Sequence, residues 1–508
     1  MNTEHTQAAS DSTQSGPIFA AIDIGSNSFH LIVARLEHGE VRPMHVLAEK
    51  VQLGKGLIDH QLADDAVERG LACIERFQQL LASVKPDKIR AVGTNALRQA
   101  HNRDVFTEPA EAILGVPVDV IYGREEARLV YLGVAHTLAD DEHSRLVVDI
   151  GGGSTEFILG RQFEPKQLES LQLGCVSYSE QFFPDGRIDK KRFKRAYEQA
   201  CIEVSHIRRH FKRAHWIEAV GSSGTLQAVE LLISTAGWRS EGIDHKSLKK
   251  LKKVLLKFES IEEIDLEGLN ERRRGVITAG VAITLAIFDV LRVEIMRTSS
   301  GALREGAIYD LIGRRSHEDV RERTVQAMLQ RYAADITNSG SVGVYAKQLG
   351  IETSKSWNLT EDDIDLLAWS GRLHEIGIGI SQKHYNRHSA YLTENSDMPG
   401  FSQGDQLFIS RLLRGHRGKL PSNLLDGLPR SKQQKFARML VLLRLAVTLK
   451  HADVPPISPE FYTKAEGDRL EVNFSPEWRK SHPLTIWEVA ESISVFKKLG
   501  VTLDLPAA

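Results

Sequence analysis

The stretch FAAIDIGSNS, from Phe19 to Ser28, has a counterpart later in the chain, VVDIGGGST, from Val147 to Thr155. Each consists of an apolar run, the triplet Asp-Ile-Gly, and then small hydroxyl or glycine residues. A short continuous apolar run predicts a buried strand, and glycine-rich backbone after a strand can direct N–H groups toward an anion. One copy alone is more often a tight turn at a strand end. Two copies predict two phosphate loops in related halves of one enzyme.

The composition indicates a soluble, multidomain protein. Its 508 residues predict three or four domains, at about 150 residues per domain. A net charge of −2 argues against general nucleic-acid binding. Cys73, Cys175 and Cys201 lack C-x-x-C spacing, so we expect buried, reduced thiols in a reducing cytosol. The most apolar stretch, Gly275–Phe288, is shorter than the roughly 20 residues that span a bilayer, and it predicts a buried helix. We expect a cytoplasmic protein without an integral membrane segment; peripheral membrane association stays open.

The pattern of elements changes along the chain. Strands and helices alternate as far as residue 313, which predicts an α/β fold with a hairpin turn at residues 37–40. Helical spacing then dominates, until Pro455, Pro456 and Pro459 mark a break. The predicted parts are a disordered tail (1–17), a first α/β domain (18–124), a second α/β domain (125–313), a helical domain (314–452) and a small α/β domain (453–508).

The aspartates of the two loops are candidate metal ligands. Asp23 and Asp149 each stand two residues before the first glycine of their loop. Mg²⁺ prefers a few carboxylates, several waters and the phosphate oxygens of a substrate. We therefore expect each aspartate to hold a divalent cation, directly or through water. The alternative is that each carboxylate caps the backbone of its own turn.

Several stretches together carry a family resemblance. They are DIGSNSFHLIVAR from Asp23, GTNALRQA from Gly93, GREEARLVYLGV from Gly123, VVDIGGGSTE from Val147, LGCVSYSEQFF from Leu173, GSSGT from Gly221 and GALREGAIYDL from Gly301. The chain resembles the exopolyphosphatase and guanosine pentaphosphate phosphohydrolase family, within the actin, Hsp70 and sugar-kinase superfamily. The resemblance implies two ribonuclease-H-like domains facing a cleft, followed by an all-α HD-like domain and a small α/β domain.

The resemblance also implies roles for individual residues. Glu126, the second glutamate of GREEAR, would activate the attacking water, although a glutamate in the first helical turn also favours the helix dipole. Glu125 would then face solvent or cap the helix. Arg98 matches the family's T-N-x-x-R and could grip phosphoryl oxygens bidentately, or be a plain surface arginine. The predicted substrate-binding residues are Ser26, Asn27, Ser28, Arg98, Gly151, Gly152, Gly153, Ser154 and Thr155. The predicted metal ligands are Asp149, Asp23 and Glu156, and Glu156 fits a plain strand residue equally well.

The choice of substrate depends on the second loop. Exopolyphosphatases tend to read GGGST there and the pentaphosphate enzymes often read GGAST, so Gly153 favours the exopolyphosphatase. We expect processive removal of terminal orthophosphate from inorganic polyphosphate, with Mg²⁺ or another divalent cation. K⁺ is a further candidate cofactor, and the family implies a homodimer. The first alternative is 5′-phosphohydrolysis of guanosine pentaphosphate (pppGpp). The distant alternative is an ATP-switched binding module of the actin or Hsp70 type.

The helical domain resembles the HD phosphohydrolase fold but departs from it. The pair is His374-Glu375 in place of His-Asp, and Arg444 falls where that fold normally has an aspartate. We expect a retained scaffold without a working HD metal centre. His384, His388 and His416 are then polyanion contacts or structural residues. Basic runs, each either a solvated face or part of a polyanion path, are Arg208–Arg213, Lys246–Lys257, Arg272–Arg274 and Arg411–Lys419.

Overall fold

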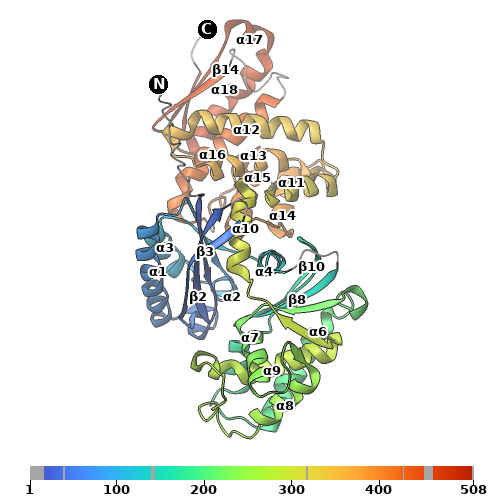
Figure 1. Cartoon of the computed structure of the whole chain (residues 1–508). Coiled ribbons are helices and arrows are strands. Elements are labelled where there is room, and N and C mark those ends of the chain that lie inside the picture. The colour runs from blue at the N-terminus through green and yellow to red at the C-terminus, as the bar shows by residue number, and fades with distance from the viewer. Residues whose placement is uncertain are drawn as a thin grey trace, which may run out of the picture. The chain divides into compact units, whose positions relative to one another are not determined.

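The computed structural model describes residues 16–37, 40–138, 143–315, 319–426, 428–450 and 461–505. It divides the chain into two compact units, Met1–Glu318 and Asp319–Ala508. The first unit contains two mixed sheets, and the second contains helices and a small sheet (Figure 1). Most of the predicted tail, the tip of the predicted hairpin turn at residues 38 and 39, and the proline-marked break lie outside the described residues.

The first unit begins with a five-stranded sheet. Its strands, in spatial order, are β3 (Glu40–Lys50), β2 (Ser28–Glu37), β1 (Ile18–Ile24), β6 (Lys88–Gly93) and β7 (Val118–Val120). Strand β1 is antiparallel to β2 and parallel to β6, and Ile24 pairs with Phe29 across the intervening turn. The predicted loop at residues 23–28, called the Asp23 loop below, therefore joins two paired strands. Helices α1 (Asp64–Val84) and α3 (Asp104–Leu114) cover one side of this sheet (Figure 1). Short elements complete this half: β4 (Leu57–Ile58), β5 (Gln61–Leu62) and α2 (Asn95–Gln99).

The second sheet repeats this arrangement. Its strands, in spatial order, are β10 (Glu164–Leu171), β9 (Thr155–Arg161), β8 (Ser144–Ile150), β11 (Glu218–Gly221), β13 (Ile295–Thr298) and β12 (Ile243–Asp244). Strand β8 is antiparallel to β9 and parallel to β11, as β1 is to β2 and β6. The Asp149 loop, residues 149–155, thus occupies the same place in its sheet as the Asp23 loop does in the first. The sequence repeat is a repeat of the fold.

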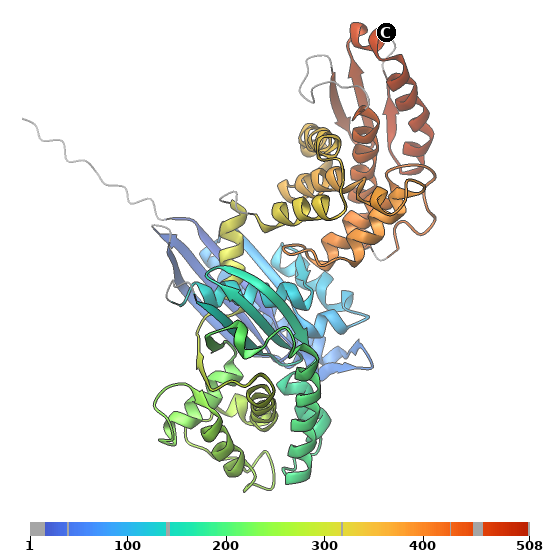
Figure 2. The ribbon, with the colours of Figure 1, turned by 90° about the vertical axis from the view of Figure 1, so that its right-hand side faces the viewer.

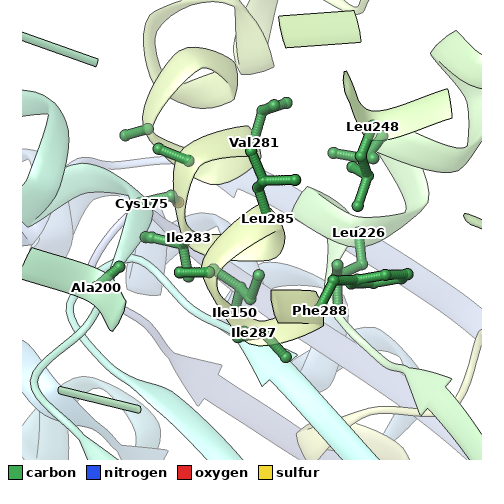
Figure 3. Packing of buried hydrophobic residues seen from close by; sticks show 14 of the residues in the cluster. Ile150, Cys175, Ala200, Leu226, Leu248, Val281, Ile283, Leu285, Ile287 and Phe288 are labelled. Atoms are coloured by element: carbon green, nitrogen blue, oxygen red, sulfur yellow. The ribbon is translucent and has the colours of Figure 1, made fainter. Parts of the chain in front are cut away.

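Helix α9 (Glu271–Leu291) forms the core of the second half. It packs on α5 (Cys175–Phe182), α6 (Lys190–Ile207), α7 (Gly224–Thr235) and α8 (His245–Leu255). Figure 3 shows Val281 and Leu285 of α9 among side chains of these neighbours, with Leu226 and Leu248 close by. In the described part of the chain α9 alone is long and apolar enough to cross a membrane, but 78% of its most apolar window is buried. The predicted buried helix is confirmed.

Two helices cross between the sheets. They are α4 (Gly123–Ala135), which precedes the second sheet, and α10 (Leu303–Arg315), which follows it. Helix α10 packs on α4 and also on β1 and β2 of the first sheet (Figure 1). The two helices cross so closely that a Cβ atom on Gly306 would lie 1.8 Å from the Leu129 carbonyl oxygen. Glycine is therefore required at this contact.

The second unit combines helices and a small sheet around one core. The helices are α11 (Val320–Arg331), α12 (Ile336–Trp357), α13 (Glu361–Leu373), α14 (Tyr385–Asn395), α15 (Gln403–Gly415), α16 (Arg430–Leu449), α17 (Pro476–Ser481) and α18 (Pro483–Lys498). The sheet consists of β14 (Phe461–Glu466), β15 (Arg469–Phe474) and β16 (Thr502–Asp504). The predicted hairpin near residue 467 is confirmed, and α18 lies along this sheet (Figure 2). One apolar cluster contains side chains of α12, α16 and the strands, so helices and sheet form one body rather than two.

The ammonium group of Lys450 lies beside the His374-Glu375 pair, the counterpart of the metal-binding His-Asp pair of the HD fold. Lys450 Nζ donates a hydrogen bond to Glu375 Oε1 at 2.6 Å and lies 3.4 Å from His374 Nε2. Arg444 donates to the Gly415 and Gly418 carbonyl oxygens. These contacts neutralise the acid and hold the neighbouring loop. They are compatible with the predicted scaffold role.

Candidate active site

The two loops meet at a cavity of about 210 Å³ in the first unit. A Cβ atom on Gly152 would lie 3.2 Å from the Asn27 nitrogen, and one on Gly153 would lie 2.5 Å from Asn95 Oδ1. The lining includes these predicted residues: Asp23, Ser26, Asn27, Ser28, Glu126, Asp149, Gly151, Gly152, Gly153, Ser154 and Glu156. The structure thus brings together nearly all of the predicted site. Bare backbone and hydroxyl groups from two strand ends face one space, which suits a phosphoryl group.

Acidic side chains crowd one side of the cavity. Desolvation, followed by repulsion from the Glu126 and Asp23 carboxylates, raises the pKa of Asp149 from 3.8 to about 7. Desolvation, followed by repulsion from Glu126 and Asp149, holds the pKa of Glu156 well above its usual value. Asp23 Oδ1 is buried without a hydrogen-bond partner. Such like-charge crowding is unfavourable for folding and is typical of a functional site.

Glu126 occupies the first turn of α4, at the edge of the cavity. The residue is 8% exposed, and its Oε2 accepts a hydrogen bond from Arg98 Nη1 at 3.0 Å. Desolvation raises the pKa of Glu126, and the charge and hydrogen bond of Arg98 oppose this rise. The arginine therefore keeps available the carboxylate form that a general base needs.

Arg98 contacts the candidate base. Its Nη1 donates both to Glu126 and to the Ile121 carbonyl oxygen, the latter at 2.9 Å. It is not among the described residues that line the cavity. Its Nη2 is buried and has no hydrogen-bond partner among the described residues. Arg98 thus holds the candidate base, and its contact with phosphoryl oxygens stays a prediction.

Three further residues have structural contacts that the sequence did not reveal. Thr155 is fully buried, its hydroxyl donates to the Leu173 carbonyl oxygen, and it does not line the cavity within the described residues. Glu156 Oε1 accepts from Ser170 Oγ at 2.8 Å. Glu125 is 4% exposed and paired with Arg128, so the expectation of a solvent-facing Glu125 is wrong, and a capping role stays a prediction. Its charge is buried because an arginine on the same helix face neutralises it.

The cavity also contains residues that the sequence analysis did not assign to a site. They are His30, Thr94, Asn95, Ser222, Ser223, Gly224, Gln227, Arg273, Ser300, Ala302, Leu303 and Arg304. The serines and Gly224 belong to the GSSGT stretch after β11, and β11 is parallel to β8. The carboxyl ends of parallel strands meet at one edge of a sheet. This rule could have placed the GSSGT stretch beside the Asp149 loop from the sequence.

Arg273 is the most informative of these additions. It lies in the first turn of α9 against Gly224, where a Cβ atom would be 2.1 Å from Arg273 Nη2. Its charge lowers the pKa of Asp149 and so opposes the carboxylates. Lys50 and Lys55 of the first half belong to the same positive region: burial lowers the pKa of Lys50, and the charges of Lys55 and Arg273 lower it further. The site is thus acidic on one side and basic on the other.

Comparisons with known proteins agree with this geometry. Residues 32–315 match the Ppx/GppA phosphatase family, and residues 320–492 match Ppx/GppA phosphatase domain III. A Vibrio parahaemolyticus protein named guanosine-5′-triphosphate,3′-diphosphate pyrophosphatase is 39% identical, over 97% of this chain and 99% of its own. The crystal structure of the Aquifex aeolicus Ppx/GppA family member is 27% identical, with a TM-score of 0.51, and the match covers 59% of this chain and 98% of that chain.

A further solved structure supports the fold alone. An exopolyphosphatase from Cytophaga hutchinsonii is 21% identical, with a TM-score of 0.54, over 58% of this chain and 97% of that one. Nearly the whole length of this chain therefore matches phosphatases. The same chain contains the paired sheets, the cavity between their loops, and Glu126 on α4. The chain belongs to the Ppx/GppA phosphatase family, whose members hydrolyse phosphoanhydride bonds.

Proposed function

We propose that this chain is a guanosine pentaphosphate 5′-phosphohydrolase, which converts pppGpp and water into ppGpp and orthophosphate. The observation that carries the proposal is the likeness along nearly the whole chain, at 39% identity, to a protein named for guanosine-5′-triphosphate,3′-diphosphate hydrolysis. The expectation that polyphosphate is the preferred substrate gives way to its alternative. The family match also favours a phosphatase over an ATP-switched binding module.

The single residue that favoured the exopolyphosphatase has another explanation. A Cβ atom on Gly153 would meet Asn95 Oδ1 at 2.5 Å, and Asn95 is itself held because its Nδ2 donates to Gln172 at 3.0 Å. Glycine at this position is therefore favoured by packing against Asn95. Both substrates also present the same terminal phosphoanhydride to the loops. Lys50 pairs with Ser28 of the Asp23 loop, and the charges of Lys55 and Arg273 act on it. This positive region suits the second phosphate group of pppGpp, its 3′-diphosphate.

The chemistry requires an activated water and a stabilised phosphoryl group. Glu126, oriented by Arg98 at 3.0 Å, takes the proton as the water oxygen bonds to the terminal phosphorus. The bond from phosphorus to the bridging oxygen breaks, and that oxygen keeps the electron pair on the departing ppGpp. Backbone N–H groups of the two loops, with the hydroxyls of Ser26, Ser28 and Ser154, hold the non-bridging oxygens. Arg273 adds positive charge, and positioning plus charge stabilisation is sufficient for phosphoryl transfer.

The donor set fits a divalent cation with few protein ligands. Asp23 Oδ1 is buried and has no hydrogen-bond partner among the described residues, and desolvation together with repulsion among the acids raises the pKa of Asp149 to about 7. Among the described residues no group of three or more His, Cys, Asp or Glu side chains is arranged to hold a metal ion. Mg²⁺ takes most of its ligands from water and phosphates. Asp23 and Asp149 would hold it, and it would supply positive charge to the phosphate oxygens. Glu156 as a third ligand, K⁺, a homodimer and a cytoplasmic location stay predictions.

The proposal is tested by phosphate release from pppGpp and from long-chain polyphosphate, each with and without Mg²⁺. We expect kcat/KM for pppGpp to exceed that for polyphosphate by at least about tenfold, which corresponds to about 1.4 kcal/mol of transition-state binding. We expect chelation of divalent cations to abolish both activities. A higher kcat/KM on polyphosphate than on pppGpp would favour the exopolyphosphatase hypothesis. Full activity without divalent cations would remove the metal from the proposal.

A further inference from the structure

A buried ion-pair network lies behind the catalytic edge of α4. Asp310 of α10 is 5% exposed. Its carboxylate accepts from Arg90 Nη1 and Arg128 Nη2, each at 2.5 Å, and from Arg314 Nε at 3.0 Å. Arg128 is also paired bidentately with Glu125, with both bonds at 2.8 Å. A chain of charges thus runs from Arg90 through Asp310 and Arg128 to Glu125, the residue before the candidate base.

The network joins the elements that form three sides of the cavity. Arg90 is on β6, where it pairs with Ala21 of β1, two residues before Asp23. Arg128 and Glu125 are on α4, on either side of Glu126. Asp310 is on α10, whose first turn lines the cavity through Leu303 and Arg304. The Asp310 carboxylate therefore ties together β6, which is the neighbour of the strand that leads to the Asp23 loop, the helix that carries Glu126, and α10.

The other end of α4 is held by backbone contact. The space for a Cβ atom on Gly133 is filled by the Ala302 carbonyl oxygen at 2.1 Å, and that on Gly306 by the Leu129 carbonyl oxygen at 1.8 Å. These contacts fix where α4 and α10 cross. The ion pairs of Arg128 and Glu125 act nearer the first turn of α4, where Arg98 also holds Glu126. They therefore add to the contacts that set the position of Glu126 relative to the loops.

Stability alone is a weak reason for such a network. Desolvating several charges is costly, and well-packed apolar side chains of similar volume are often as stabilising. Bidentate arginine–carboxylate contacts instead fix orientation. We propose that Asp310 is a positioning residue for Glu126: through Arg128 it sets the distance between the base and the phosphate loops. The inference rests on the proposed hydrolysis by Glu126.

The test compares Asp310→Asn with a matched control, Asp119→Asn. Asp119 Oδ2 lies 3.5 Å from Arg90 Nε at the β7 end of the same network, and 22% of its side chain is exposed. We expect Asp310→Asn to lower kcat on pppGpp by about 10- to 100-fold, since a misplacement of about 1 Å costs on that order. KM should stay within about twofold, because the loops are unchanged. Asp119→Asn should leave both constants within about twofold.

One further variant keeps the inference decidable. If Asp310→Asn does not fold, by circular dichroism and thermal unfolding, Glu125→Gln decides, since it keeps the side-chain shape and removes the charge that pairs with Arg128. We expect it to lower kcat about fivefold with unchanged pppGpp binding. The inference is overturned if folded Asp310→Asn or Glu125→Gln keeps wild-type kcat, or if Asp119→Asn loses as much. If wild type releases phosphate from polyphosphate and not from pppGpp, the proposed substrate fails, and the same kcat ratios on polyphosphate still decide the role of Asp310.

Discussion

The two phosphate loops have the same strand frame and different electrostatic surroundings. Asp23 lies 3.4 Å from His30 Nδ1 through one carboxylate oxygen and leaves the other unpartnered. Asp149 faces Glu126 and Asp23, and its pKa rises to about 7. The first loop contributes hydroxyl and amide groups, and the second contributes bare glycine backbone and an acid whose pKa is raised by desolvation and by neighbouring carboxylates. The strand frame is thus repeated, whereas the surroundings of the two aspartates differ.

The largest expected effect separates the two aspartates. Under the proposed metal-assisted reaction, Asp149→Asn should lower kcat/KM on pppGpp by about 1000-fold, because it removes a carboxylate that would hold the cation. Asp23→Asn should cost about 10- to 100-fold, since the amide oxygen can still contact a metal-bound water. Steady-state phosphate release measures both. Equal losses would mean that the two loops are functionally equivalent and would contradict the asymmetry.

A second expectation concerns stability and pH. The folded pKa of Asp149 is about 7 against 3.8 for an ordinary aspartate, so between these values the folded protein binds a proton that the unfolded chain does not. This linkage makes stability fall as pH rises from about 4 to about 7. The Asp149→Asn variant lacks this carboxyl group, so it does not lose stability in this way as the pH rises. The variant should therefore gain on the order of 2 kcal/mol relative to wild type between about pH 5 and pH 8.

Denaturant unfolding of metal-free wild type and metal-free Asp149→Asn, at about pH 5 and about pH 8, measures this difference in stability. Asp23→Asn is the matched control, since it removes the same kind of side chain from the sister loop. A wild type whose stability does not fall relative to Asp149→Asn as the pH rises would rule out the crowding of acids around Asp149.

The smallest expected effect on catalysis is at Thr155. The predicted substrate-binding role conflicts with its burial and with its hydrogen bond to the Leu173 carbonyl oxygen. Thr155→Val should keep kcat/KM within about twofold and lower the free energy of unfolding by about 1–3 kcal/mol, because the carbonyl loses its donor. Ser154→Ala in the same loop is the comparison, since Ser154 lines the cavity. A tenfold loss of activity in folded Thr155→Val would return Thr155 to the substrate site.

Local pattern was enough to predict the loops and the α/β repeat, because an apolar run followed by Asp-Ile-Gly is a complete short-range signal. The role of Glu126 came from the family resemblance, since a glutamate in the first turn of a helix is common. Ser222 and Arg273 lie in stretches named from the sequence, but their place at the cavity, like that of Arg304, depends on the packing of distant strands and helices.

Side-chain direction was the other limit of the sequence. Arg98 is long enough to reach either a phosphate or the Glu126 carboxylate, and only the fold decides between them. The same holds for Glu125, whose burial depends on Arg128 and, through it, on Asp310 far along the chain. Residue type and spacing predict which groups are near the site, but not which of them contact one another.

The central claim is that Glu126 is the base of a hydrolase that acts on pppGpp. The most direct measurement is single-turnover phosphate release from pppGpp by wild type and Glu126→Gln, with pppGpp binding measured in parallel. Glu126→Gln keeps the shape of the side chain and can still contact Arg98. We predict that it binds pppGpp within about threefold of wild type and releases phosphate at least about 100-fold more slowly. Undiminished release by a folded Glu126→Gln would contradict the assignment of the base.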